Sequence, residues 1–273
     1  MKSLYSEEIS AIYHHGSKIA LTRDWHDKNV VCPNSKIYYV LDGEVCVETE
    51  RERYVAKKGD AILIPAGIKH SYHLTELGYA EKYWFHFDLK IGQISYFDTL
   101  SFDYVKHLGI DESVINLFKS VVSAKDGTPA RRITRLSSIY SIMAICLEDA
   151  SFLESRANVI DETDAVIDYI RENYREKFTL DALAAKAKLS PNYFAKKFKE
   201  RLGQPPLKYV NNLKIERAKF LLEHTDNAIG EIMDEVGFLD SAHFSKIFKL
   251  TTGYSPTKFR HVLTSRKKGL KST

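Results

Sequence analysis

The chain has 273 residues, with 40 Lys and Arg against 36 Asp and Glu, so its formal net charge is only +4. Its composition is 44% hydrophobic, 12% aromatic and 28% charged, which is typical of globular domains and excludes a disordered, collagenous or disulfide-dense chain. At ~100–200 residues per domain, the length predicts one large or two ordinary domains.

Short strands alternate with turn signals across residues 20–95. Tyr38–Leu41 is aromatic and β-branched, and Asp42–Gly43 after it is a hairpin signal. Further strands are expected at Val45–Val47, Tyr54–Val55, Ala61–Ile64, His70–Leu74 and Tyr79–Leu89. Several short strands with regular turns predict a sandwich or barrel.

The hydrophobic period then changes from that of strands to that of helices. Asp111 is placed to cap a helix over 111–124, which the segment Gly127–Pro129 breaks. A second helix is expected from about Arg132 to Leu153, because its apolar residues recur at helical spacing. The two helices either cover the barrel or supply a dimer seam, and residues 154–161 are the best linker candidate.

The C-terminal part of the chain repeats itself. Six positions match at an offset of 50, namely Phe194, Phe198, Lys199, Gly203, Pro206 and Tyr209 with Phe244, Phe248, Lys249, Gly253, Pro256 and Phe259. Upstream, Leu180, Leu183 and Ala187 match Ile229, Ile232 and Val236 at an offset of 49. The second copy therefore has one more residue in its turn, and two copies indicate a pair of related subdomains.

Each copy is predicted to be a helix, a tight turn and a second helix. In the first copy, Ser190 is placed to cap the second helix and Gly203 to end it. The aromatic pairs of both copies face inward, and the polar positions face outward. One helix over Pro206–Glu223 joins the copies, which fixes their relative placement.

Charge is concentrated in this repeated part of the chain. Residues 1–160 carry a net charge of −2, whereas residues 178–273 carry +9. The helix-turn-helix places its second helix in the major groove of DNA, where polar or small side chains read bases and basic ones meet phosphates. The basic candidates are Lys196, Lys197, Lys199, Arg201, Lys246 and Lys249. The repeat and the charge together predict DNA binding, against the plainer reading of a helical interaction domain with solvated lysines.

Residues Leu180–Arg260 resemble the AraC/XylS family of transcription regulators. The matching features include the Gly237–Phe238 turn, the Phe248–Lys249 pair and the closing Phe259–Arg260. The resemblance implies base reading by Asn192, Ala195 and Lys196 in the first unit, and by Ser241, Ala242, His243 and Lys246 in the second. The chain departs from the family at Lys214 and Lys246, where arginine is usual or frequent, and lysine lacks the bidentate fork of arginine.

The segment Gly59–His70 resembles the second cupin motif, which implies a small β-barrel. The upstream His-x-His of metal cupins is missing, so we expect neither a metal nor another cofactor. The family resemblance implies that the barrel binds a small-molecule effector, possible contacts being Arg23, Trp25, Tyr38, His70, Tyr72, Trp84 and His86. Trp84 resembles the position where sugar-responsive relatives stack a sugar ring, although an aromatic-rich barrel core explains the same residues.

The expected fold is α+β with two domains. A cupin-like effector-binding domain with an N-terminal arm of about 15 residues covers 1–100, a helical dimerisation segment 101–153, and a double helix-turn-helix domain 162–273. The expected function is that of a non-enzymatic transcription regulator, whose partners are double-stranded DNA, a small-molecule effector, a second copy of the chain and the transcription machinery. The alternatives are a cupin-type metalloenzyme fused to a DNA-binding domain and a ligand-independent DNA-binding protein.

The chain also indicates where the protein works. It has three cysteines without CxxC spacing, no apolar leader at its start and no uncharged apolar run near ~18 residues. These features predict a cytoplasmic protein without a membrane partner.

Overall fold

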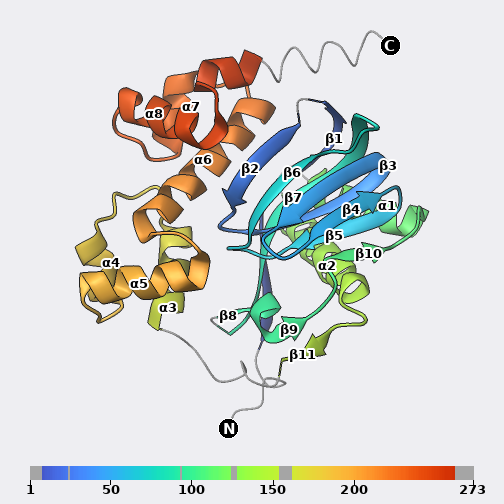
Figure 1. Cartoon of the computed structure of the whole chain (residues 1–273), viewed down its shortest axis with the longest axis horizontal. Coiled ribbons are helices and arrows are strands. Elements are labelled where there is room, and N and C mark those ends of the chain that lie inside the picture. The colour runs from blue at the N-terminus through green and yellow to red at the C-terminus, as the bar shows by residue number, and fades with distance from the viewer. Residues whose placement is uncertain (1–7, 24, 93, 124–127, 154–161, 262–273) are drawn as a thin grey trace. The chain divides into compact units, whose positions relative to one another are not determined.

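The structure, a computed structural model, describes residues 8–23, 25–92, 94–123, 128–153 and 162–261 (Figure 1). It divides into two compact units, Met1–Ile160 and Asp161–Thr273. The linker predicted at 154–161 lies outside the described residues.

The first unit consists mainly of antiparallel strands, and four of those described, β4, β5, β6 and β7, pair with the long strand β3 (Figure 1). The strands are β1 (Ile9–Thr22), β2 (His26–Val31), β3 (Ser35–Thr49), β4 (Arg53–Lys57), β5 (Asp60–Ile64), β6 (Lys69–Leu74), β7 (Tyr79–Ile91), β8 (Ile94–Ser95), β9 (Leu100–Ser101), β10 (Val105–His107) and β11 (Ser151–Phe152), with a 3-10 helix η2 (Tyr96–Thr99). One sheet runs β1-β7-β3-β5-β10; β3 also pairs with β4 and β6, and β6 pairs with β2. This strand-rich unit confirms the predicted cupin-like fold class.

Strand β3 differs from the prediction, because Asp42–Gly43 is not a hairpin turn. The strand continues through both residues, with a register shift against β7 between Val40 and Asp42. Gly43 has a φ of 71°, and a Cβ there would lie 2.3 Å from the carbonyl oxygen of Tyr79. A glycine at a bulge lets a strand bend, so the first half of β3 pairs with β5 and β7 and the second half with β4 and β6.

Strand β1 begins earlier than the expected arm allows. It pairs with β7 along its whole length, from Ile9 opposite Ile91 to Thr22 opposite Tyr79. Residues 9–15 therefore belong to the sheet, where pairing satisfies their backbone groups. Residues 1–7 of the predicted arm lie outside the described part of the chain.

Two helices, α1 (Glu112–Val122) and α2 (Pro129–Cys146), follow the strands. Asp111 caps α1 as predicted, because its side chain accepts a hydrogen bond from the backbone N–H two residues on, at 2.8 Å. Helix α2 is shorter than the helix expected over 132–153. It also begins earlier, because Thr128 is its N-cap and the proline that follows is its first residue. That proline starts a helix, for which its fixed φ suits it, and the chain after α2 returns as strand β11.

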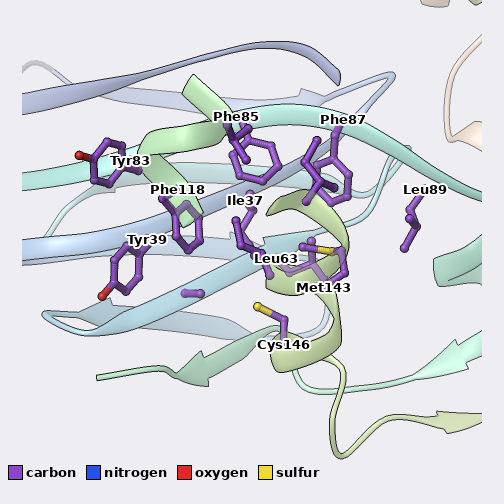
Figure 2. Packing of buried hydrophobic residues seen from close by; sticks show 14 of the residues in the cluster. Ile37, Tyr39, Leu63, Tyr83, Phe85, Phe87, Leu89, Phe118, Met143 and Cys146 are labelled. Carbon is purple, nitrogen blue, oxygen red and sulfur yellow. The ribbon is translucent and has the colours of Figure 1, made fainter. Parts of the chain in front are cut away.

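Apolar clusters lie on opposite faces of β7. Phe85 and Phe87 pack with α1 and α2 on one face, whereas Trp84 packs against the cluster on the other face. Figure 2 shows Phe118 of α1 beside Tyr39 of β3; their rings stack with centroids 4.6 Å apart. Successive residues of β7 thus face opposite sides of the sheet, and the two helices cover one of these faces.

The second unit is helical. Its helices are α3 (Glu162–Glu172), α4 (Leu180–Lys186), α5 (Pro191–Leu202), α6 (Pro206–His224), α7 (Ile229–Glu235) and α8 (Ser241–Thr252). One core gathers residues of α3, α4, α5 and the first half of α6, and another gathers the second half of α6 with α7 and α8. Helix α6 thus contributes to both cores, as predicted for the joining helix.

Among the described residues, no helix is both long and apolar enough to cross a membrane. The three cysteines are buried and carry thiol groups rather than disulfides. Burial raises the pKa of Cys146 to about 12, which keeps its thiol protonated and unreactive.

Candidate DNA-binding and effector sites

The two helix-turn-helix units share the geometry of their turns. Lys188 after α4 and Gly237 after α7 both have positive φ, 56° and 78°. The next residue, Leu189 in one unit and Phe238 in the other, donates its backbone N–H to the carbonyl oxygen five residues earlier, at 3.0 Å in both. This bond closes the end of a helix whose following residue is left-handed. The repeat in the sequence is therefore a repeat in structure.

Helix α5 buries an aromatic side and exposes the side predicted to meet DNA. Its buried residues are Phe194, Phe198 and Leu202. Of the predicted contacts, Asn192, Lys196 and Lys199 are exposed, and Ala195 and Lys197 are half-buried. The Nζ atom of Lys196 lies 3.9 Å from Glu200 in an exposed pair. Exposed pairs of this kind contribute only ~0.3–0.5 kcal/mol, so a phosphate readily replaces the carboxylate.

Helix α8 has the same arrangement. It buries Phe244 and Phe248. All five residues predicted to meet DNA are exposed, namely Ser241, Ala242, His243, Lys246 and Lys249. The imidazole of His243 lies beside the buried ring of Phe238, with centroids 5.5 Å apart, which limits its orientations.

The caps of the two helices differ. Asp240 caps α8, since its Oδ1 accepts a hydrogen bond from the His243 N–H at 2.6 Å. Ser190 takes the N-cap position of α5 as predicted, but its side chain makes no capping hydrogen bond. Helix α5 thus starts on the favourable φ of Pro191 alone.

Lys214 of α6 bonds to backbone next to the first helix-turn-helix unit and within the second. Its ammonium donates to the carbonyl oxygens of Arg175, Glu176 and Gly237, at 3.4, 3.1 and 2.7 Å. The first two carbonyls follow α3, and the third lies in the turn before α8. The approach is close, because a Cβ at Gly237 would lie 2.0 Å from the Arg175 carbonyl oxygen. Burial lowers the pKa of Lys214. The sequence shows that Lys214 stands where arginine is usual, but it does not reveal the backbone partners of this lysine.

Several predicted effector contacts surround a buried lysine of the first unit. The ring of Trp25 lies 5.9 Å from that of Tyr38 and 4.6 Å from that of Tyr72, centroid to centroid. The Nζ atom of Lys82 lies 3.9 Å from the Trp25 centroid and 3.1 Å from the Tyr38 centroid, within cation–π range. Lys82 is only 2% exposed. Sequence reasoning missed it, although alternation along β7 places it on the face of Trp84.

A second group of rings lies further along β7. Trp84 and His86 have ring centroids 5.3 Å apart, and His15 of β1 lies 5.6 Å from the first and 4.4 Å from the second. The Nδ1 atom of His86 is 3.9 Å from the Sγ atom of Cys32. Trp84 is half-buried and His86 is buried, as expected of residues facing the inside of a barrel.

The remaining two candidates have different surroundings. His70 is buried beside Tyr72, and its Nδ1 lies 2.7 Å from the Ile68 carbonyl oxygen, to which it donates when protonated. Arg23 is exposed, and its side chain lies against Gly78. The structure thus gathers the predicted rings into neighbouring groups and leaves Arg23 at the surface.

Cys46, Glu48 and His73 hold potential metal ligands within 4.8 Å of one another. Cys46 and Glu48 share one side of β3, and His73 pairs with Cys46 across β6. Arg53 donates through Nε to the Cys46 sulfur at 3.2 Å and lies 3.8 Å from Glu48. A guanidinium cation at this place opposes the binding of a metal cation, so we assign these residues to an ion-paired network.

Comparison with known proteins matches both units. A helix-turn-helix domain matches residues 183–261, and a cupin domain matches residues 33–85. The HTH-type transcriptional activator RhaS of Salmonella agona is 23% identical over 239 residues, which cover 86% of this chain and 82% of the relative. RhaS of Salmonella typhimurium gives the same identity and coverage.

Solved structures of ToxT from Vibrio cholerae have a similar fold. The apo form of one ToxT variant has a TM-score of 0.59 at 13% identity, covering 93% of this chain and 97% of that one. ToxT with a bound unsaturated fatty acid has a TM-score of 0.58 at 14% identity, covering 94% and 95%.

The fold, the two exposed helix faces and these relatives define a two-domain transcription regulator that binds DNA. These matches support an AraC-type regulator, in which a cupin-like N-terminal domain is followed by a C-terminal double helix-turn-helix domain.

Proposed function

We propose that α5 and α8 enter successive major grooves of one DNA duplex and read an operator. The observation that carries this proposal is the matched pair of exposed polar faces on helices whose aromatic sides are buried. Lys214 supports it, because hydrogen bonds from one ammonium to carbonyls of both units hold the helices in a defined relation. Base reading is assigned to Asn192, Ala195, Lys196, Ser241, Ala242, His243 and Lys246, and phosphate contact to Lys197, Lys199 and Lys249.

Salt dependence tests the phosphate contacts. Lys199→Ala is expected to weaken binding to every DNA sequence and to reduce the slope of log K against log salt by about one unit, because one fewer phosphate is neutralised. The matched control is Lys119→Ala, an exposed lysine on α1 of the first unit, which should leave the slope unchanged. Equal slopes for all three proteins would contradict the assignment.

Selection from random DNA tests the base contacts. Lys196→Ala and His243→Ala are each expected to change the preferred base at a few operator positions, since a good base contact contributes ~1–3 kcal/mol of discrimination. The two variants should change base preference in different parts of the site that one chain binds, because the residues lie on different helices. Selection of the wild-type operator by both variants would reject the groove assignment.

The proposed effector is a small molecule, a sugar or another metabolite, that contacts the rings of the first unit. Aromatic walls with a few polar groups are typical of small-molecule sites, and Trp25, Tyr38, Tyr72 and Trp84 lie in one apolar cluster. ToxT, which shares the fold, was solved with an unsaturated fatty acid, so fatty acids belong in the same screen.

Thermal shift with sugars, other metabolites and fatty acids tests this proposal. The compound that stabilises the wild type should lose most of its effect on Trp84→Ala, because the ring that it contacts is gone. Tyr96→Ala, a half-buried ring in η2, serves as the control and should keep the shift. A large shift with a fatty acid and none with any sugar would replace the sugar by a fatty acid as effector, and an undiminished shift in Trp84→Ala would remove Trp84 from the site.

The proposal includes activation of transcription, a dimer and no catalysis. Activation is supported by the name of the RhaS relatives, and a dimer is supported by exposed apolar side chains on α2, Ile133 at 68% and Tyr140 at 38%. A reporter gene behind the selected operator measures activation through the transcription machinery. About one iron or manganese ion per purified chain would favour the metalloenzyme alternative.

A further inference from the structure

The turn of the second helix-turn-helix unit contains one residue that the first unit lacks. Lys188 and Leu189 correspond to Gly237 and Phe238 in backbone conformation and hydrogen bonding. We call α5 and α8 the reading helices. The next residue of the first unit, Ser190, is already the N-cap of α5, whereas in the second unit the N-cap of α8 is Asp240. Leu239 is therefore the additional residue.

Leu239 is the most exposed large apolar side chain of the described residues, at 86%. Its neighbours are held in place on both sides. Phe238 is 4% exposed and belongs to the core of the unit, and Asp240 is bound to the first turn of α8. A leucine between two anchored residues presents its apolar side chain to the surroundings in a defined position.

The position of Leu239 suggests what covers it. The residue immediately precedes α8, and the N-terminal residues of a reading helix are those that meet base edges. Among the exposed residues that follow, Ser241, His243, Ser245 and Lys246 carry polar or basic groups that suit a polyanion. Within the major groove, the one apolar group on a base edge is the C5-methyl of thymine.

We propose that Leu239 packs against the C5-methyl group of a thymine in the operator and so selects thymine at that position. This inference rests on the proposed function, because it requires α8 in the major groove. It adds a contact from a residue outside the helix to the base contacts assigned above. The additional turn residue then gives the second unit a specificity that the first unit does not have.

Replacing thymine by uracil tests the contact, because uracil lacks only the methyl group. Each thymine of the selected operator is replaced singly, and full-length protein is titrated with each duplex. For the wild type, one replacement among the base pairs that α8 contacts should weaken binding about fourfold, the factor that corresponds to ~0.8 kcal/mol for one buried methyl-sized group. For Leu239→Ala, the thymine and uracil duplexes should bind equally.

The matched control is Leu250→Ala, since Leu250 is 73% exposed near the C-terminal end of α8. It should keep the wild-type ratio between thymine and uracil duplexes. This inference alone would be overturned if the wild type bound the thymine and uracil duplexes equally at every position while Lys199→Ala still weakened binding. Reduced reporter expression by Leu239→Ala with an unchanged ratio would assign Leu239 to a protein partner and also overturn it. Failure to select any DNA sequence would overturn the proposed function together with it.

Discussion

Replacing Lys214 by methionine removes an ammonium that three backbone carbonyl oxygens share. Methionine keeps most of the apolar stem of the buried Lys214 but leaves the three carbonyl oxygens without this donor, a loss of ~1–3 kcal/mol. We therefore expect Lys214→Met to lower the free energy of unfolding by about 2 kcal/mol, measured by urea unfolding and helical circular dichroism. Lys214→Arg retains the charge and the donors and should lose less. Equal stability of wild type and Lys214→Met would contradict the assigned role.

The same residue predicts a dependence on pH. Burial lowers the pKa of Lys214 in the folded protein below its ordinary value of 10.5. Between these two pKa values the unfolded chain binds more protons, so stability rises with pH in that window. The rise should be absent from Lys214→Met. The difference in unfolding free energy between the two proteins, measured at several alkaline pH values, isolates this effect from tyrosine titration, and a constant difference would contradict it.

Residue patterns predict the burial of side chains more successfully than they predict the groups that those side chains contact. Helical spacing was enough to place the aromatic pair of Phe244 and Phe248 in a core and Lys246 outside it. It gave no sign that Lys214 bonds to backbone carbonyls far along the chain. Lys82 was overlooked because a charged residue on a strand is usually exposed, and no local pattern reveals the aromatic rings that lie beside its ammonium.

The N-cap side chains of α5 and α8 differ in hydrogen bonding, so their removal should lower the free energy of unfolding by different amounts. Asp240→Ala should destabilise the protein by ~1 kcal/mol, because it removes a side-chain acceptor from the first turn of α8. Ser190→Ala is the matched change at the corresponding position of α5, where the serine makes no capping bond, so it should cost much less. Urea unfolding of the two variants measures the difference. A larger loss for Ser190→Ala would show that the cap positions are misassigned.

Elements were predictable where local chemistry alone decides them. The start of α1 followed from the cap at Asp111. The bend in β3 was mistaken for a turn, because a glycine with positive φ suits a hairpin and a bulge equally, and only pairing with β6 and β7 distinguishes them. The pairing of residues 9–15 with β7 was missed for the same reason, since it depends on a strand about 70 residues away.

At the scale of the whole molecule, the charge follows the two units. Residues 1–160 carry a net charge of −2 and residues 178–273 carry +9, and the structure divides at residue 160. The charge difference therefore favours the second unit as the part that meets DNA, in agreement with the repeat. It did not separate the exposed lysines of the reading helices from the buried Lys214, which contributes equally to the count.

A dimer would join two copies of the DNA-binding unit on one operator. Ile133 is 68% exposed on α2, and Ile133→Glu places a charge at the proposed seam. We expect this variant to sediment as a monomer of 31.3 kDa, whereas the wild type sediments at twice that mass. Its affinity for a single half-site should not change, but its affinity for a full operator should fall by ~10²–10⁴-fold, because the second unit no longer binds intramolecularly.

Leu77→Glu is the control for this change, since it introduces the same charge at a leucine that is 55% exposed in the loop before β7. It should remain a dimer and bind the full operator as the wild type does. Dissociation of both variants would mean that added charge, rather than the seam on α2, weakens the dimer. A wild-type chain that sediments at 31.3 kDa while it fills both half-sites would show that the two copies meet only on DNA. In that case the seam on α2 predicts that Ile133→Glu reduces the cooperativity with which two copies bind the operator, and unchanged cooperativity would contradict the seam.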